Sequence, residues 1–262
     1  MLLKSSGGGI MIPNYRFVAA ALIFVLITPF LLSCQPKPIV VLRVGTNAEY
    51  PPFEYKENNQ FVGVDIDLIR LLAKRLDMKI EIMDMQFNSL IPALTSNKID
   101  LAISAISISD ERQLLVNFSI PYYMANQVLI APKYSAVKVE KLNDMSKYKI
   151  GTQMGTTGQT YLEENLIAGN ILRPEQLKTY GSNRLAIQDM MDGNVDMVII
   201  DDSAAQGYST QKPLKIVYEI STQESYGIAV SQKSPYLKKI NTELAKIIKS
   251  GEMDKIIQAN GM

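Results

Sequence analysis

The chain has 262 residues, with 27 basic and 26 acidic side chains, one cysteine, no histidine and no tryptophan. A single cysteine excludes an internal disulfide bond, and the lack of histidine removes most metal sites and most general bases. The balanced charge gives no basic surface of the kind that nucleic acid requires. We therefore expect no cofactor, no metal ion and no nucleic-acid partner.

The N-terminal residues 1–34 have the pattern of a lipoprotein signal peptide. Two basic residues precede the apolar run FVAAALIFVLITPFLL, which at 16 residues is short for a membrane span. The following LLSC resembles the lipobox of bacterial lipoproteins, which implies lipid on Cys34. The alternatives are an ordinary signal peptide with an unrelated cysteine, and a start at Met11. Cleavage leaves 25 basic against 26 acidic residues, and QPKP opens a linker over residues 35–40.

The rest of the chain alternates between strand and helix patterns, which is typical of parallel sheets flanked by helices. IVVLRVGT is an apolar strand, and DIDLIRLLAKRL repeats apolar residues with helical spacing behind two aspartates. KIEIMDM then alternates as a strand, FNSLIPALTSN is a short helix and IDLAISAIS is the next strand. Near the carboxyl end, YGIAVS and the helices PYLKKINTELAKIIKSG and EMDKIIQAN are expected to pack on the first half.

One segment of the sequence occurs twice. FNSLIPALTSNKIDLAIS and NRLAIQDMMDGNVDMVII align without gaps 96 residues apart, so that Asp100 matches Asp196. A repeat of this length is usually structural, and it predicts one helix–turn–strand unit in each of two similar lobes. Ligands bind outside the carboxyl ends of strands in open α/β sheets. Asp201, after the strand VDMVII, is therefore expected at a binding edge, and Asp202 is expected to cap the next helix.

The chain is expected to cross between the lobes twice, which predicts a hinge. The predicted boundaries are residues 41–123 and 226–262 for lobe 1, 128–220 for lobe 2, and 124–127 and 221–225 for the hinge.

Six motifs in this order carry a resemblance to a known family: GTNAEYPPFEY, GVDIDL, FNSLIPAL, AISISDERQ, IGTQMGTTG and VDMVIIDD. Together they resemble the family 3 periplasmic solute-binding proteins of amino-acid ABC transporters, over roughly Val41 to Ala259. The resemblance implies an α/β periplasmic-binding-protein fold of type II, with two lobes, each a mainly parallel sheet flanked by helices. A two-strand hinge would close these lobes around a free amino acid.

The resemblance also implies where the α-amino and α-carboxyl groups of the ligand bind. Arg112 in SDERQ would hold the α-carboxylate, because a planar guanidinium matches both carboxylate oxygens. Asp201 would accept hydrogen bonds from the α-ammonium. Further contacts are implied for Ser104, for the backbone of Ala105, and for Ser107, Thr156 and Thr157. The alternative interpretations are an ordinary surface ion pair for the arginine and a helix cap for the threonines.

The resemblance further implies that the ligand's side chain meets two aromatic residues, Tyr50 and Phe87, whose rings attract cations. Asn47 stands where lysine- and ornithine-preferring relatives have an aspartate, and Gln153 occupies a second specificity position. These residues favour arginine or another basic amino acid, with glutamine or cystine as alternatives. The two aromatic residues are alternatively part of the core.

Two other functions are alternatives to amino-acid capture. A dehydratase-like enzyme on the same scaffold would need a general acid or base with a shifted pKa and a second partner. A receptor's sensor module would need a membrane span and an output domain after the lobes. We expect instead a monomeric, non-enzymatic lipoprotein, periplasmic or at the cell surface, that delivers its amino acid to the permease of an ABC importer.

Overall fold

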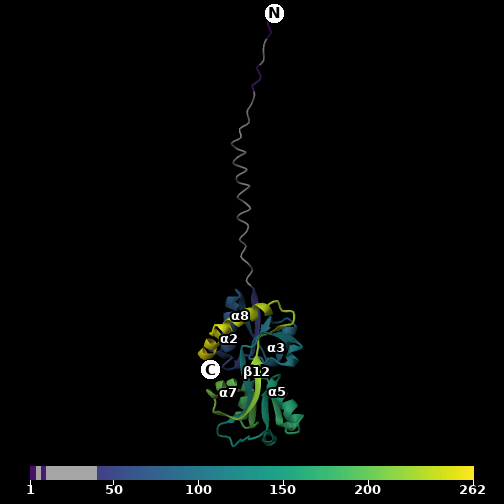
Figure 1. The fold of residues 1–262 in the computed structure, drawn as a ribbon, viewed down its shortest axis with the longest axis vertical. Helices are drawn as coiled ribbons and strands as arrows, with labels where there is room; N and C mark the ends of the chain where they lie inside the picture. Colours follow the sequence, from purple (N-terminus) through teal and green to yellow (C-terminus); the bar gives the residue numbers. More distant parts are fainter. Residues whose placement is uncertain (4–6, 10–39) are drawn as a thin grey trace. The chain divides into compact units, whose positions relative to one another are not determined.

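The computed structural model describes residues 1–3, 7–9 and 40–262. Most of the expected signal peptide, Cys34 and the linker up to residue 39 lie outside this range. Residues Val40–Met262 form one unit, to which the following description applies (Figure 1). None of the helices in the described residues is long and apolar enough to cross a membrane.

Two five-stranded sheets form the framework of this unit, and each defines one lobe. The lobe 1 sheet has the order β5-β1-β6-β13-β7, with β5, β1 and β6 parallel and β13 antiparallel to both neighbours. Its strands are β1 (Val41–Thr46), β5 (Lys79–Asp84), β6 (Leu101–Ala102), β7 (Val116–Phe118) and β13 (Ala229–Ser231). A three-stranded antiparallel sheet adjoins the site: β2 (Glu49–Tyr50), β3 (Glu54–Glu57) and β4 (Gln60–Val62).

The lobe 2 sheet has the order β10-β9-β11-β8-β12, again with three parallel strands followed by antiparallel ones. Its strands are β8 (Tyr123–Pro132), β9 (Ile150–Gln153), β10 (Leu177–Tyr180), β11 (Met197–Asp201) and β12 (Leu214–Tyr226). The long strands β8 and β12 pair with each other as far as Tyr123 and Tyr226, and β12 runs between the two lobes in Figure 1. These two strands connect the lobes.

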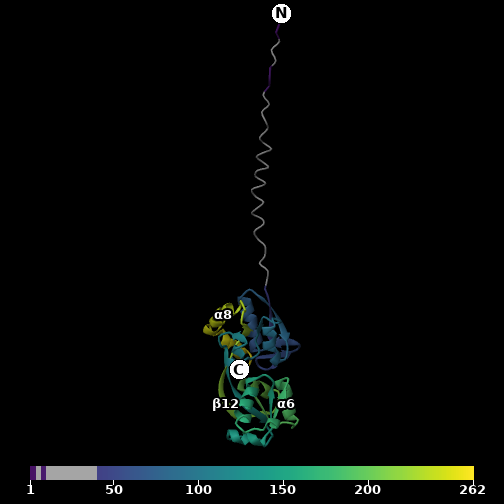
Figure 2. The same ribbon diagram turned by 90° about the vertical axis from the view of Figure 1, so that its right-hand side faces the viewer.

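Helices cover both sheets, and the longer ones have an apolar side in the core. In lobe 1 they are α2 (Val64–Arg75), α3 (Leu90–Thr95), α4 (Asp110–Gln113), α8 (Leu237–Lys249) and α9 (Glu252–Ala259). In lobe 2 they are α5 (Thr157–Tyr161), α6 (Asn183–Met191) and α7 (Asp202–Ser209), with α6 facing the viewer in Figure 2. Shorter turns are the 3₁₀ helices η2 (Phe87–Ser89), η3 (Leu142–Lys147) and η5 (Pro174–Gln176) and the π-helix η4 (Leu162–Ile167).

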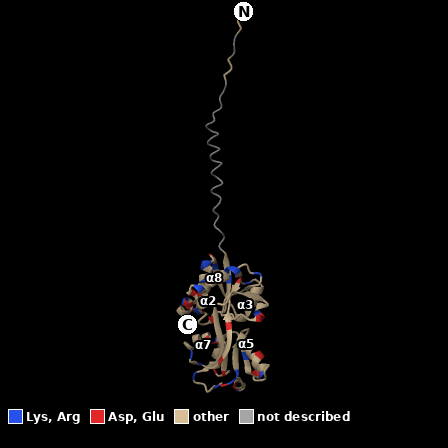
Figure 3. Ribbon diagram, in the orientation of Figure 1, with Lys and Arg blue, Asp and Glu red and all other residues tan. Residues whose placement is uncertain are grey.

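The core consists of separate apolar clusters on the two sheets. In lobe 1, Leu72 of α2 and Leu244 of α8 pack with Val44 of β1 in one cluster. In lobe 2, Ile187 of α6 packs with Val198 of β11. Basic and acidic residues are interspersed over the outer helices and loops (Figure 3).

The sequence repeat corresponds to a repeated structural device. Asp100 accepts a hydrogen bond from the backbone N–H of Arg43, at 2.8 Å, and returns one from its own N–H to the carbonyl of Arg43. Asp196 makes the same pair of contacts with Lys149, at 2.7 and 2.9 Å. Each aspartate therefore holds the strand that follows the helix of its repeat unit beside the start of the neighbouring parallel strand. The two copies lie in different lobes. The first copy consists of α3 and β6 of the lobe 1 sheet, and the second consists of α6 and β11 of the lobe 2 sheet.

Two expectations about local structure were wrong. The strand expected over residues 99–107 ends at Ala102, because the chain turns into the site and Ala105 adopts a left-handed conformation with φ of 45°. Its N–H is bound by the buried carboxylate of Asp65 at 2.7 Å. Asp202 does not cap α7, since it is the first helical residue and Asp201 holds the N-cap position.

Candidate ligand-binding site

A cavity between the two lobes contains all of the side chains that the sequence placed in the ligand site. Its empty volume is about 420 Å³, including space at its mouth. The expected residues that line it are Asn47, Tyr50, Phe87, Ser104, Ala105, Ser107, Arg112, Gln153, Thr156, Thr157 and Asp201. The lining also contains Glu54, Gln127, Asn183, Ile199 and Ile200, which the sequence did not indicate.

The two sheets position these residues through the carboxyl ends of their parallel strands. Asn47 follows β1, Ser104 follows β6, Gln153 ends β9 and Asp201 ends β11. Adjacent parallel strands end at the same edge of a sheet, so short loops bring residues that are distant in sequence into one cavity.

Asp201 is a buried carboxylate with three donors. It is 7% exposed and accepts hydrogen bonds from Tyr50 Oη at 2.7 Å, from Tyr226 Oη and from Gln127 Nε2. Burial and the nearby carboxylate of Glu224 raise the pKa of Asp201 to about 7, against the opposing effect of the tyrosine hydrogen bonds. The side chain is therefore poised to take up a cation, which would favour its ionised form.

Arg112 lies at the end of α4, with its guanidinium stacked on the ring of Phe87, 5.4 Å from the ring centroid. Its Nη1 donates to the carbonyl of Ser107 at 2.6 Å, and its Nη2 donates to the carbonyl of Gly155 in lobe 2 at 3.0 Å. Among the described residues no carboxylate forms a salt bridge with it. Arg112 therefore presents a cation to the cavity that the protein itself does not neutralise by direct contact.

The two threonines of the site have different partners. Thr156 is the N-cap of α5, because its hydroxyl accepts from the N–H of Gln159 at 3.2 Å and donates to the carbonyl of Gln153 at 2.8 Å. The hydroxyl of Thr157 instead donates to the carboxylate of Glu224 at 2.6 Å. The capping interpretation thus describes Thr156, whereas Thr157 takes part in a polar network.

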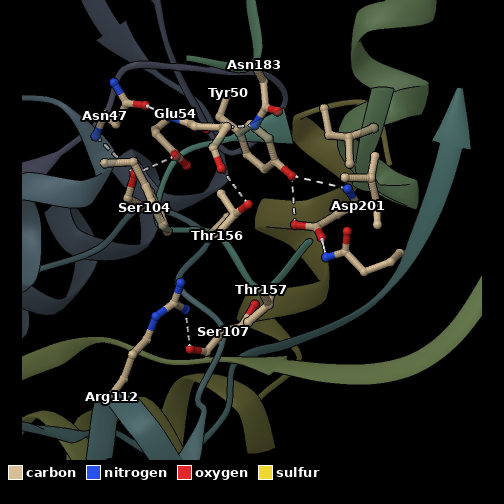
Figure 4. A pocket seen from close by; sticks show the side chains of 16 residues that line it. Asn47, Tyr50, Glu54, Ser104, Ser107, Arg112, Thr156, Thr157, Asn183 and Asp201 are labelled. Atoms are coloured by element: carbon tan, nitrogen blue, oxygen red, sulfur yellow. Dashed lines mark hydrogen bonds between the residues drawn. The ribbon is translucent and has the colours of Figure 1, made fainter. Parts of the chain in front are cut away.

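Polar side chains gather at the end of the cavity away from Arg112 (Figure 4). Glu54 is 1% exposed, and its Oε1 accepts from Ser104 Oγ at 2.7 Å. Its buried Oε2 accepts no hydrogen bond from a donor among the described residues, although the carboxyl group shares a hydrogen bond with the carboxyl group of Asp65. Burial and the neighbouring Asp65 raise the pKa of Glu54 well above its usual value. This end of the cavity therefore holds a carboxyl group that would ionise on meeting a cation.

Amide groups continue this polar end into lobe 2. Asn183 Nδ2 donates to Gln153 Oε1 at 2.7 Å, and Gln153 Nε2 donates to Asn47 Oδ1 at 2.9 Å. Because each amide oxygen has a second lone pair, Asn47 and Gln153 keep an acceptor for a ligand.

Several contacts join the lobes across the cavity. Tyr50 of lobe 1 bonds Asp201 of lobe 2, and the carboxylate of Glu49 lies 3.4 Å from the guanidinium of Arg184. The hydroxyl of Tyr208 also donates to the carbonyl of Glu49. These bonds hold the lobes against each other in the geometry described here.

Five polar residues of the site were missed at the sequence level: Glu54, Gln127, Asn183, Glu224 and Tyr226. Gln127 and Glu224 lie in the segments expected to form the hinge, so polar residues in those segments were a usable signal. Glu54 carried no such signal, because its neighbours alternate as in an ordinary strand.

A family model described as bacterial extracellular solute-binding proteins, family 3, matches residues 42–260. The chain belongs to this family. The resemblance of its six motifs is therefore confirmed, and so is the α/β fold of two sheets flanked by helices. Members of the family are binding proteins, so this chain is a solute-binding protein and not an enzyme.

The similar proteins include two curated relatives and a solved structure. The arginine-binding extracellular protein ArtP of Bacillus subtilis (strain 168) is 35% identical over 222 residues, 82% of this chain and 84% of the relative. A probable histidine-binding protein of Neisseria gonorrhoeae is 33% identical over 226 residues, 84% and 82% of the two chains. An ancestral arginine-binding protein bound to arginine is 36% identical with a TM-score of 0.78, covering 85% of this chain and 98% of that one.

Proposed function

We propose that this family 3 protein captures free L-arginine and delivers it to an ABC importer. That the relatives named above bind amino acids supports an amino-acid ligand. The choice of arginine is supported by the charges in the cavity, which are considered one end at a time.

The α-amino and α-carboxyl groups of an amino acid fit the charges of Arg112 and Asp201. The guanidinium would bind the α-carboxylate and the aspartate would bind the α-ammonium, each in a buried environment where charge-assisted hydrogen bonds contribute about 1.5–3 kcal/mol. Four or five such contacts, less the cost of immobilising the ligand and closing the lobes, correspond to roughly micromolar binding, about −8 kcal/mol.

The observation that carries the choice of arginine is the extra carboxyl group of Glu54. The lining residues include one base, Arg112, and two acids, Glu54 and Asp201. A zwitterionic backbone uses one acid and the base, which leaves Glu54 for a positively charged ligand side chain. Burying a carboxylate without a partner is costly, so a neutral ligand such as glutamine would leave Glu54 protonated or unpaired.

A guanidinium fits this end better than an ammonium. It has five N–H donors in a plane, and the acceptors here are Glu54 Oε2, which receives no donor among the described residues, and the amide oxygens of Asn47 and Gln153. The rings of Tyr50 and Phe87, which also line the cavity, suit the flat face of a guanidinium and the aliphatic stem below it.

Delivery would follow from closure of the lobes about the two strands β8 and β12. Ligand bonds to both lobes favour the closed form, which presents surfaces of both lobes to a permease in one fixed geometry. We further propose a monomer tethered outside the cytoplasm by lipid on Cys34, a residue outside the described part of the chain. A small-angle scattering profile that stays the same on adding arginine would contradict closure.

Calorimetry on the chain from Gln35 onward tests the ligand. The protein is unfolded and refolded to remove carried-over ligand, then titrated with arginine, lysine, ornithine, histidine, glutamine and cystine. We expect arginine to bind most tightly, Arg112→Ala to abolish binding of all of them, and Glu54→Gln to weaken arginine about 100-fold while leaving glutamine little changed. Arg173→Ala, which removes an exposed charge at 72% side-chain exposure, is the matched control.

If glutamine or cystine binds more tightly than arginine, the charge argument from Glu54 is wrong. If no amino acid binds to the folded protein, the assignment of Arg112 and Asp201 to a zwitterion is wrong.

A further inference from the structure

Glu224 is a carboxylate of the connecting strand β12 that lies directly behind the site. The pairing of β12 with β8 is interrupted between Ile220 and Glu224, where Gln223 has a left-handed φ of 49°. Glu224 is half-buried and is not among the described residues that line the cavity. Its position thus depends on an irregularity in the strand that joins the two lobes.

Hydroxyl groups from both lobes donate to this one carboxylate. Ser107 of lobe 1 and Thr157 of lobe 2 both donate to Oε2 of Glu224, the second at 2.6 Å. Gln127 Nε2 donates to Oε1 at 3.1 Å and also to Asp201. Glu224 therefore bridges the lobes through two hydroxyls that line the cavity beside Arg112.

A hydroxyl group has a single proton to donate. While Ser107 and Thr157 donate to Glu224, neither can donate to a ligand carboxylate placed at Arg112. The charge of Glu224 also acts on the same guanidinium, since it opposes the lowering of the Arg112 pKa that burial causes. Glu224 is thus a carboxylate of the protein itself that interacts with the same two hydroxyls and the same guanidinium that a ligand carboxylate needs.

We propose that Glu224 competes with the ligand's α-carboxylate for the hydroxyl protons of Ser107 and Thr157, and that this competition lowers affinity and assists ligand release. Because Glu224 lies behind the cavity wall, it does not have to move when ligand enters, and only the hydroxyl protons change partner. When ligand leaves, the same protons return to Glu224, so neither hydroxyl is left buried without a partner.

The test compares arginine with agmatine, which has the same guanidinium and amine but lacks the α-carboxylate. The choice of these probes rests on the proposed function. Agmatine is measured by its displacement of radiolabelled arginine from the purified protein. Removing the charge of Glu224 changes the attraction of the cationic groups to the same extent in arginine and in agmatine. The ratio of the two dissociation constants therefore reports only on the interactions of the ligand's α-carboxylate.

We expect Glu224→Ala to raise the ratio of the agmatine to the arginine dissociation constant about tenfold. Glu224→Gln, which keeps an acceptor oxygen without the charge, is expected to give a smaller rise and serves if the alanine variant folds poorly. Glu219→Ala, an exposed acidic residue of the same strand, is the matched control and should leave the ratio unchanged.

An unchanged ratio in both Glu224 variants would overturn the proposal. A lowered ratio would also overturn it, because it would mean that Glu224 holds the two hydroxyls in the geometry that the ligand needs. If the wild-type protein binds no arginine, the proposed ligand is wrong, and the same comparison is made with the amino acid that does bind and its decarboxylated amine.

Discussion

The pKa of Asp201 predicts that ligand binding weakens in acid. In the ligand-free protein this pKa is about 7, and an α-ammonium bound to the carboxylate would lower it. At pH 8 the group is mostly ionised with and without ligand, so its contribution to affinity is at its plateau. Below pH 7 the carboxyl must release a proton before it binds the ammonium, and each pH unit then costs about 1.4 kcal/mol.

The loss expected from Asp201 alone is about 30-fold, or about 2 kcal/mol, between pH 8 and pH 5.5, where roughly 3% of Asp201 is ionised. Calorimetry in two buffers of different ionisation enthalpy counts the protons released. Because the raised pKa of Glu54 adds proton release of its own, the measurement is repeated in Glu54→Gln, where about one proton per ligand should remain at pH 5.5. An affinity that is flat over this range, or binding without proton release in that variant, would refute the reasoning.

The same group links pH to folding stability. The pKa of Asp201 is raised from 3.8 to about 7 on folding, so its stabilising contribution is complete below pH 3.8 and is lost as pH rises through 7. The difference is up to ~4 kcal/mol. Denaturant unfolding of the ligand-free protein should show about 2.6 kcal/mol of this loss between pH 5 and pH 8, and the remainder below pH 5. Asp201→Asn should reduce it and also abolish binding.

Two further predictions concern closure and the core. A Cβ at Gly207 of α7 would lie 2.5 Å from the carbonyl oxygen of Pro51 in the other lobe, so Gly207→Ala should obstruct closure and weaken arginine binding about tenfold. Unaltered affinity would show that the lobes need not approach so closely. Leu244 of α8 is fully buried, and Leu244→Ala should lower the free energy of unfolding by about 2–5 kcal/mol without changing the dissociation constant for arginine. A changed dissociation constant in the folded variant would contradict the separation of this core from the site.

Much of the site was predictable because strand ends mark it. Apolar strands followed at once by polar residues, as at Ser104 and Asp201, are local patterns, and so is the repeat that places one such strand in each sheet. The arginine and the glycine-threonine turn became informative only through the family resemblance, since either pattern alone also fits a surface ion pair or a helix cap.

The parts that were missed depend on contacts between distant residues. The strand that was expected to reach Ser107 ends at Ala102, because the N–H of Ala105 donates a hydrogen bond to Asp65, 40 residues earlier in the chain. Glu54 meets Ser104 across 50 residues, and Glu224 meets Ser107 across 117. No local periodicity encodes such pairs, so a sequence pattern predicts the framework and leaves the polar network behind the cavity undetermined.

The matching contacts of Asp100 and Asp196 have an evolutionary consequence. If both helix–turn–strand units descend from one duplicated ancestor, their equivalent positions began with the same residue and the same surroundings. Ala105 is then the counterpart of Asp201, because both follow the aligned segments by one residue. The ancestral pair would have formed a symmetric cleft, whereas an amino acid has two different ends. Divergence at such positions, here to a backbone turn in one copy and a carboxylate in the other, and likewise at Ser104 and Ile200, would have made the two walls of the cleft different while both aspartates kept the scaffold unchanged.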